Sequence, residues 1–415
     1  MSTVDTATAV TTATAATAAT AATAATAETA DAETAPDLLY SEAENDLRAA
    51  VRSLLTDRAD VPAALARAES AAPYDTALWT SLAAGIGAAG LLVPEALGGQ
   101  GASHREAAVV LEELGRAVTP APYLTSSVIA TQTLLALGGA VPAVAELLGA
   151  LAEGRTVAVL AVPLSTGPDT PLPDTVPGGG TGHEIGAVAD AAIADVLLVL
   201  GDDGLYAVGT AAPGVTVRAR TPLDLTRPLS TVTVDAAALA AGTRLAHTET
   251  AEAAVRRGLL AGAGLLASEQ LGLAEWCLEE TVRHTRERHQ FNRPIGSFQA
   301  LKHRMAHLWL EVVSARSAAR NAADALATGS PDAPLAVAVA QAYCGRVAVH
   351  AAEECVQLHG GIGMTWEHPA HLYLKRAKSD EIALGSTGSH RDSLATLTGL
   401  PAPGVPGAPL RQDRA

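Results

Sequence analysis

Residues 286–299 read Arg-Glu-Arg-His-Gln-Phe-Asn-Arg-Pro-Ile-Gly-Ser-Phe-Gln and separate two long helical patterns. Phe291 and Phe298 are the only two phenylalanines of the chain, and they lie among several cationic side chains. An arginine fork holds phosphate oxygens through paired hydrogen bonds, and amide side chains bind the polar edges of a ligand. The stretch therefore predicts a site for a phosphate-bearing, hydrogen-bonding ligand between two helices.

A second dense stretch, residues 357–368, reads Gln-Leu-His-Gly-Gly-Ile-Gly-Met-Thr-Trp-Glu-His. Its paired glycines let the backbone approach a ligand closely, because glycine carries no Cβ. The two stretches together supply the arginines, glutamines and glycines that such a ligand requires.

Composition limits the class of protein. The chain has 415 residues, enough for two or three domains with a large core. It is 48% apolar but only 3% aromatic, so the core must consist mostly of Ala, Leu and Val. The formal net charge of −16 argues against a nucleic-acid partner. No apolar run is long enough for us to expect a membrane span.

The cysteines and the N-terminus indicate the compartment. Cys277, Cys344 and Cys355 have no metal or redox spacing and fall in helical patterns, where buried thiols are expected. No basic residue precedes Arg48, which argues against signal and transit peptides. We therefore expect a cytoplasmic protein.

Periodicity divides the chain into five segments. Residues 1–36 form a Thr/Ala-rich tail that is expected to be disordered, because it has little to bury. Helical patterns fill 38–153, short β-rich runs fill 155–247, and helical patterns return over 248–397. Residues 398–415 form a Pro-rich tail that is expected to be loose.

Local signals refine these segments. Ser41 with Glu44, and Ser103 with Glu106, form capping boxes at helix starts, and Gly115 is expected to end the second helix. Asp202-Asp203-Gly204 predicts a hairpin turn. The expected strands are 156–162, 196–200, 205–208, 215–219 and 231–234.

The order of helices, β-domain and helical bundle resembles the acyl-CoA dehydrogenase family over residues 38–397, most specifically in 269–306 and 340–391. The resemblance implies an α+β fold with an N-terminal helical domain, a small middle β-domain and a C-terminal four-helix bundle. It also implies FAD as cofactor.

The resemblance assigns roles in the first stretch. Arg288 lies where the family's arginine contacts the FAD pyrophosphate, with Phe291 at +3 packing on the cofactor and Gln299 at +11 hydrogen-bonding it. Taken singly, Arg288 also fits an exposed surface arginine and Phe291 fits simple core packing. The shared spacing favours the cofactor role.

The second stretch resembles the family's Gln-x-x-Gly-Gly turn, which reaches the adenosine half of FAD. Its matching residues are Gln357, Gly360 and Gly361. A glycine helix cap is the alternative for the pair. In the family, these residues meet the flavin bound by a neighbouring subunit. The resemblance therefore implies a shared site in a homo- or hetero-oligomer, a dimer or a tetramer.

The family's catalytic base has no counterpart at either of its known positions. A carboxylate removes the α-proton while FAD takes a hydride from the β-carbon. In most members that Glu precedes a glycine, with an arginine six residues beyond it. Gly385 and Arg391 keep this spacing, but the base position is Leu384. The other position used in the family corresponds to Gly262. The catalytic residue is thus unassigned.

Four acidic residues are candidates for a relocated base. Asp380 and Glu381 are more simply interpreted as solvated charges at a helix end, and Glu269 as a structural hydrogen bond or salt bridge; Glu367 is the fourth. Several histidines occur nearby, but none has a metal partner at i+4, and no metal site is predicted.

The β-domain departs from the family pattern. It has no Thr-Glu-x-x-Ala-Gly-Ser-Asp-like stretch, and no Trp lies between Tyr123 and Trp276, so the usual flavin-stacking Trp is missing. The half-site that would serve a partner's flavin is intact.

Three functions remain open. The first is an FAD-dependent dehydrogenase that forms an α,β double bond in an acyl-CoA or acyl-carrier-protein thioester. The second is a non-catalytic subunit that completes the FAD site of a Glu-bearing sibling. The third is a flavin-dependent oxygenase on the same fold. The sequence does not specify the acyl group or the electron-transfer partner.

Overall fold

The computed structural model describes residues 38–58, 65–67, 69–70, 73–139, 141–179 and 182–400. The described residues from Tyr40 onward belong to one compact unit. The predicted tail at 1–36, and residues 401–415 of the predicted C-terminal tail, lie outside the described residues.

The N-terminal part of the unit is helical. The helices are α2 (Glu42–Arg58), α4 (Thr76–Thr80), α5 (His104–Arg116), α6 (Thr131–Leu137) and α7 (Pro142–Ala152). Short 3-10 or π turns join them: η1 (Ser81–Gly85), η2 (Ala88–Gly90), η3 (Glu95–Leu97) and η4 (Tyr123–Ala130). Both predicted capping boxes are confirmed. Ser41 N–H donates to Glu44 at 2.6 Å, and the reciprocal bonds form between Ser103 and Glu106.

Gly115 does not end α5, which continues to Arg116. A Cβ on Gly115 would lie 2.2 Å from the carbonyl oxygen of Glu269, and one on Gly272 would lie 1.9 Å from that of Glu112. The prediction that Gly115 terminates the helix was wrong, because both glycines allow two helix backbones to touch. The contact fixes α5 against the long helix α9 (Thr248–Glu287).

Two sheets follow the N-terminal helices. One has the order β1-β3-β4-β7 and the other β2-β6-β5. Their bounds are β1 (Ala158–Leu160), β2 (His183–Ala189), β3 (Val196–Gly201), β4 (Gly204–Gly209), β5 (Val215–Arg220), β6 (Leu229–Val234) and β7 (Thr243–His247), with α8 (Ala236–Ala241) before β7. Gly201 pairs with Gly204, which confirms the predicted hairpin.

Strands β2 and β7 were not predicted. A register shift between Ile185 and Val188 interrupts the alternation of β2, and β7 has one buried residue, Leu245. Neither strand therefore shows the period-2 pattern that reveals a half-buried strand.

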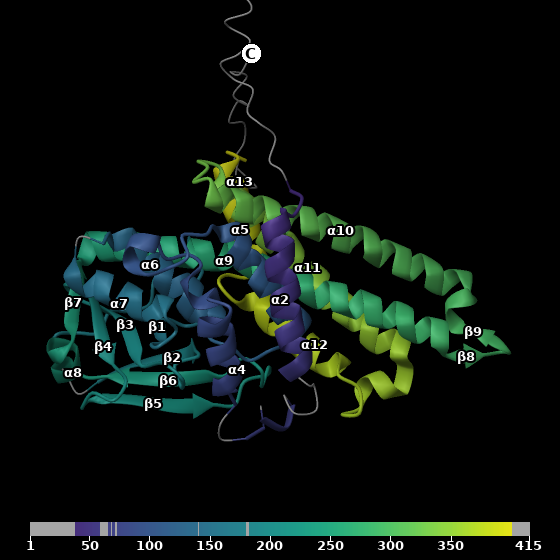
Figure 1. The fold of residues 1–415 in the computed structure, drawn as a ribbon, viewed down its shortest axis with the longest axis horizontal. Coiled ribbons are helices and arrows are strands. Elements are labelled where there is room, and N and C mark those ends of the chain that lie inside the picture. The colour runs from purple at the N-terminus through teal and green to yellow at the C-terminus, as the bar shows by residue number, and fades with distance from the viewer. Residues whose placement is uncertain are drawn as a thin grey trace, which may run out of the picture. The chain divides into compact units, whose positions relative to one another are not determined.

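The C-terminal part is again helical. It contains α9, α10 (Gln299–Ala327), α11 (Ala333–His359), α12 (Ala370–Ile382) and α13 (Thr387–Leu397). Between α9 and α10 lie β8 (His289–Gln290), β9 (Arg293–Pro294) and η5 (Ile295–Ser297), and η6 (Gly360–Met364) follows α11. Helix α9 runs from the sheets at one end to the β8–β9 hairpin at the other, beside α10 and α11 (Figure 1). This order of helical, β and helical parts confirms the predicted α+β fold.

Helix α11 and the turn after it form the most apolar helical stretch. Among the described residues, Ala333–Met364 alone is long and apolar enough to cross a membrane, and 67% of its most apolar window is buried within the fold. Such burial is typical of a core helix.

Candidate functional site

The end of α9, the β8–β9 hairpin, the start of α10 and the end of α11 line an open cavity of about 610 Å³. Arg288, Phe291, Gln357, Gly360 and Gly361 line it, so five of the six predicted cofactor residues lie together. The sixth, Gln299, is not part of the lining. Its side chain lies 3.4 Å from a ring nitrogen of His303 on the same helix.

The hairpin presents Phe291 at its tip. Gln290 pairs with Arg293, and the two central residues, Phe291 and Asn292, have φ values of 52° and 62°. Positive φ at both positions is the type I′ geometry that matches strand twist. It is strained for a phenylalanine by ~1–3 kcal/mol, yet 85% of Phe291 is exposed. The ring is therefore held out at the cavity edge, available to a ligand or a second chain.

Gly360 caps α11 and also lines the cavity, so the two interpretations of the glycine pair both apply to it. Its φ is +63°, which favours glycine, and a Cβ on either Gly360 or Gly361 would meet nothing within 4 Å. The pair thus leaves this wall of the cavity as bare backbone.

Three further cationic or aromatic groups line the same cavity: His284, Arg304 and His359. Sequence reasoning missed His284 and Arg304, and it placed His359 near the site but favoured a structural role for it. The rings of His284 and His359 are in contact, with centroids 4.1 Å apart and planes tilted by 31°. Burial disfavours the charged form of His359, but its hydrogen bonds to Cys355 raise its pKa overall. No spacing rule connects positions so far apart in the chain, and a single histidine is more often structural.

The lining fits the predicted cofactor. Arg288 supplies a guanidinium for phosphate oxygens, Gln290 and Gln357 supply amides for polar ring edges, and Phe291 and Phe298 supply flat apolar faces. The volume lies within the range of ligand pockets. The lining as a whole therefore suits a ligand that combines phosphates with a planar polar ring.

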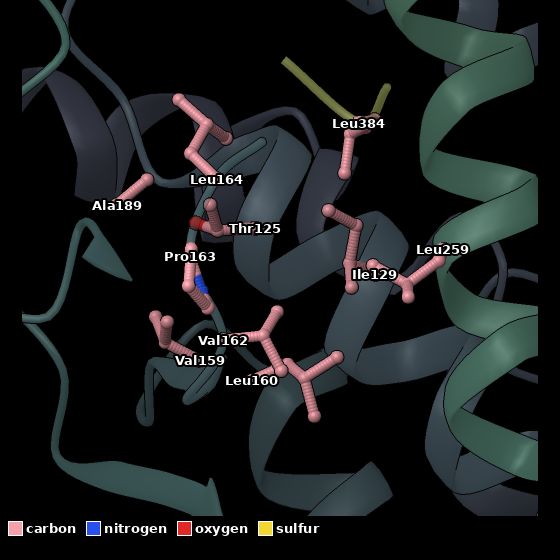
Figure 2. Close-up of a pocket in the computed structure, with 10 residues that line it drawn as sticks. All are labelled: Thr125, Ile129, Val159, Leu160, Val162, Pro163, Leu164, Ala189, Leu259 and Leu384. Atoms are coloured by element: carbon pink, nitrogen blue, oxygen red, sulfur yellow. The ribbon is translucent and has the colours of Figure 1, made fainter. Parts of the chain in front are cut away.

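The two positions expected for a catalytic base lie against each other at a different place in the fold. A Cβ on Gly262 would lie 3.2 Å from Leu384 Cδ1 and 2.6 Å from Ile129 Cγ1. Figure 2 shows Leu384, Ile129 and Leu259 beside a cavity whose labelled lining has Thr125 as its one hydroxyl. This cavity measures about 20 Å³, roughly the space of one water molecule. It holds no base and has no room for a thioester.

Comparisons with known proteins agree with this architecture. Residues 41–154 match the acyl-CoA dehydrogenase N-terminal domain, and residues 251–397 match the C-terminal domain. The acyl-CoA dehydrogenase IpdE2 of Mycolicibacterium smegmatis is 36% identical over 345 residues, covering 83% of this chain and 95% of the relative. The chain belongs to the acyl-CoA dehydrogenase family.

Solved acyl-CoA dehydrogenase structures share the fold. The ChsE4–ChsE5 complex from Mycobacterium tuberculosis has a TM-score of 0.75 and 27% identity, covering 88% of this chain and 100% of that one. A steroid acyl-CoA dehydrogenase variant, Tcur3481–Tcur3483, has a TM-score of 0.74 and 27% identity, covering 86% and 98%. A glutaryl-CoA dehydrogenase from Mycobacterium smegmatis, solved with FADH2, matches in fold at a TM-score of 0.73 and 21% identity, covering 87% and 96%.

In this member of the acyl-CoA dehydrogenase family, Glu269 belongs to a buried ion-pair network. Its carboxylate pairs with Arg227 and Arg376, which confirms the structural interpretation of this residue. Burial raises the pKa of Glu269, and the two arginines lower it, with a net lowering. An acid held ionised by two arginines is a poor candidate for abstracting a proton.

Asp380 was predicted to be a solvated charge, and this prediction was wrong. Its side chain is fully buried, with one oxygen 3.3 Å from Arg227 Nη2. Burial raises the pKa of Asp380 well above its ordinary value. The sequence could not show this, because the compensating arginine comes from the loop between β5 and β6. Of the other candidates, Glu381 lies 3.9 Å from Lys378, and Glu367 is exposed.

The length of α9 separates the two parts of the site. Gly262 and Arg288 are 26 positions apart on or at the end of this one helix, which corresponds to ~39 Å at 1.5 Å per residue. One small ligand cannot contact both within a single chain.

Proposed function

We propose that this chain is a subunit of a heteromeric acyl-CoA dehydrogenase. In this assembly it completes the FAD site of a sibling chain that carries the catalytic Glu. The observation that supports this best is the base position itself, where Leu384 packs against Ile129 and Gly262 around a cavity of about 20 Å³. A homo-oligomer would join the Arg288 cavity to this same closed position and would lack a base.

In the assembled site, the residues of this chain bind and orient. Arg288 would hold the pyrophosphate of FAD by charge-assisted hydrogen bonds, and Gln357 with the bare backbone at Gly360 would hold the adenosine half. Phe291 would cover the cofactor and exclude water. FAD, when bound, accepts a hydride from the β-carbon of the acyl thioester.

The sibling would supply the remaining chemistry. A positioned carboxylate removes the α-proton and contributes ~10²–10⁴-fold in rate. The substrate class is an acyl-CoA or acyl-carrier-protein thioester. Because one solved structure of similar fold is described as a steroid acyl-CoA dehydrogenase, a polycyclic acyl-CoA is the first substrate to test, beside a straight-chain acyl-CoA as control.

The test is co-expression with a family member that has Glu where this chain has Leu384. We expect bound flavin and thioester oxidation from the pair, and little or none from this chain alone. Replacing the sibling's Glu by Gln should abolish turnover while flavin stays bound. Robust α,β-dehydrogenation by the lone wild-type chain would overturn the proposal.

A further inference from the structure

Three potential ligand atoms converge where the end of α9, the end of α11 and the start of α12 meet. Glu280 Oε1 lies 3.6 Å from His359 Nε2 and 3.3 Å from His368 Nε2. All three atoms lie within 4.8 Å of one another. Tetrahedral zinc with bonds of ~2.0–2.1 Å places its ligand atoms about 3.3–3.4 Å apart, and the two distances from Glu280 Oε1 are close to this spacing.

The surroundings of His359 suit a metal ligand. Its side chain is 1% exposed, and its Nε2 is a buried nitrogen without a hydrogen-bond partner. Its Nδ1 lies 2.7 Å from the carbonyl oxygen of Cys355. Because a carbonyl only accepts, Nδ1 carries a proton, and Nε2 is the ring nitrogen that can bind a ligand. A backbone carbonyl that fixes the tautomer in this way is the usual outer partner of a metal-binding histidine.

We propose that Glu280, His359 and His368 form a binding site for a divalent transition-metal ion, with Zn²⁺ as the best match. Two imidazoles and one carboxylate are borderline ligands that suit zinc better than magnesium or calcium. Three protein ligands leave a fourth position open for water or an anionic oxygen. His359 also lines the cavity of about 610 Å³, so the ion adds positive charge at its wall.

Ion binding has to retain or replace the hydrogen bonds that these side chains already make. Arg283 donates to both carboxylate oxygens of Glu280, from Nε to Oε2 at 2.9 Å and from Nη2 to Oε1. A carboxylate oxygen has two lone pairs, so monodentate coordination uses the Oε1 lone pair that the arginine does not occupy. Ala370 N–H points to His368 Nδ1 at 3.2 Å. Coordination through Nε2 moves the His368 proton to Nδ1, so binding exchanges this long hydrogen bond for a metal–nitrogen bond.

The sequence could not reveal this site. Zinc spacings recognisable in a sequence place two ligands within a few residues of each other. Here the closest pair, His359 and His368, is separated by the η6 turn, and Glu280 comes from a different helix. Only the packing of α9 against α11 brings them together.

Metal binding is tested on the full chain after stripping with a chelator. Zn²⁺ is titrated against a chromophoric competitor, and Co²⁺ absorbance reports the geometry. We expect one ion per chain with a tetrahedral cobalt spectrum, and a Tm that rises with Zn²⁺. Outer-shell substitutions weaken zinc sites by about 10–100-fold, so loss of a direct ligand should weaken binding at least as much.

The variants separate this site from adventitious binding. His359→Ala and His368→Ala should lose the tight ion, and His303→Ala, an exposed histidine outside the cluster, should keep it. His368→Ala is the safer variant, because its ring is 12% exposed and less embedded than that of His359. Equal zinc affinity in the wild type and His368→Ala, or no Tm response to zinc in the wild type, would overturn the proposal. Neither result depends on flavin binding.

Discussion

Leu384→Glu restores the residue type expected at the family's base position. From the structure we expect this variant to lose stability and to gain no thioester oxidation. Leu384 is 1% exposed and lies against the Gly262 and Ile129 positions, where the remaining space is about 20 Å³. Its backbone is already fixed, since its N–H donates to Leu164 at 2.7 Å and its carbonyl accepts from His390 at 3.0 Å. A longer polar side chain has no direction in which to extend toward water.

The magnitude follows from burial. Replacing the leucine gives up ~1.5–3 kcal/mol of apolar burial, and an unpartnered buried carboxyl costs ~1–3 kcal/mol more. The free energy of unfolding should therefore fall by roughly 3–6 kcal/mol, and Tm by on the order of 10 °C. The apolar surroundings hold the new carboxyl protonated, with a folded pKa above the unfolded value of ~4.3. The folded state then binds more protons, so stability falls further as pH rises above about 4.

The assay is thermal denaturation across pH, together with thioester oxidation by the chain alone. Leu384→Gln is the matched control, because it has the same shape and polarity but cannot ionise. Both variants should be less stable than the wild type, and only Leu384→Glu should lose stability with rising pH. Neither should oxidise an acyl-CoA. A stable Leu384→Glu chain that turns over thioester would refute the closed-site argument.

Three further outcomes are expected. In the flavin-bound assembly, Arg288→Ala should weaken FAD affinity about tenfold to a hundredfold, measured by flavin retention, whereas Arg286→Ala, which lies outside the cavity lining, should not. Gly115→Ala should lower the free energy of unfolding by ~1–3 kcal/mol through overpacking, whereas Gly85→Ala, with nothing within 4 Å of its added Cβ, should change it little. Burial lowers the pKa of His104 to about 4, so stability should fall as pH drops from ~6.5 toward 4, and His104→Asn should flatten this part of the pH profile.

The features that the sequence predicted correctly are local. Ser103 and Glu106 are three residues apart, and the Asp202-Asp203 turn joins adjacent strands, so neighbouring residues decide both. Arg288 caps α9 directly before the hairpin that carries Phe291, so both residues line one cavity as neighbours in the chain.

The features that it missed depend on partners distant in the chain. A glycine after a helical pattern is typical of a helix end, which is why Gly115 was expected to end α5. Only its close contact with the backbone of Glu269 on α9 shows that Gly115 allows two helices to cross. Asp380 has the pattern of a solvated charge until Arg227 is placed beside it. A charged side chain can be buried only where a compensating partner lies beside it. The periodicity of the sequence does not identify a partner that is distant in the chain.

The same long helix leads to a prediction about stoichiometry. Each chain presents its Arg288 cavity ~39 Å along α9 from its own base position, so every complete site combines the cavity of one chain with the base of another. In a pair made of this chain and a Glu-bearing sibling, one site joins this cavity to the sibling's Glu. The reciprocal site joins the sibling's cavity to Leu384 and Gly262, where the space of about 20 Å³ admits no flavin ring. The purified heteromer should therefore contain one FAD for every two chains, measured by flavin absorbance against protein mass. One FAD per chain would show that the space beside Leu384 opens on assembly, and would return this chain to the class of complete dehydrogenase subunits.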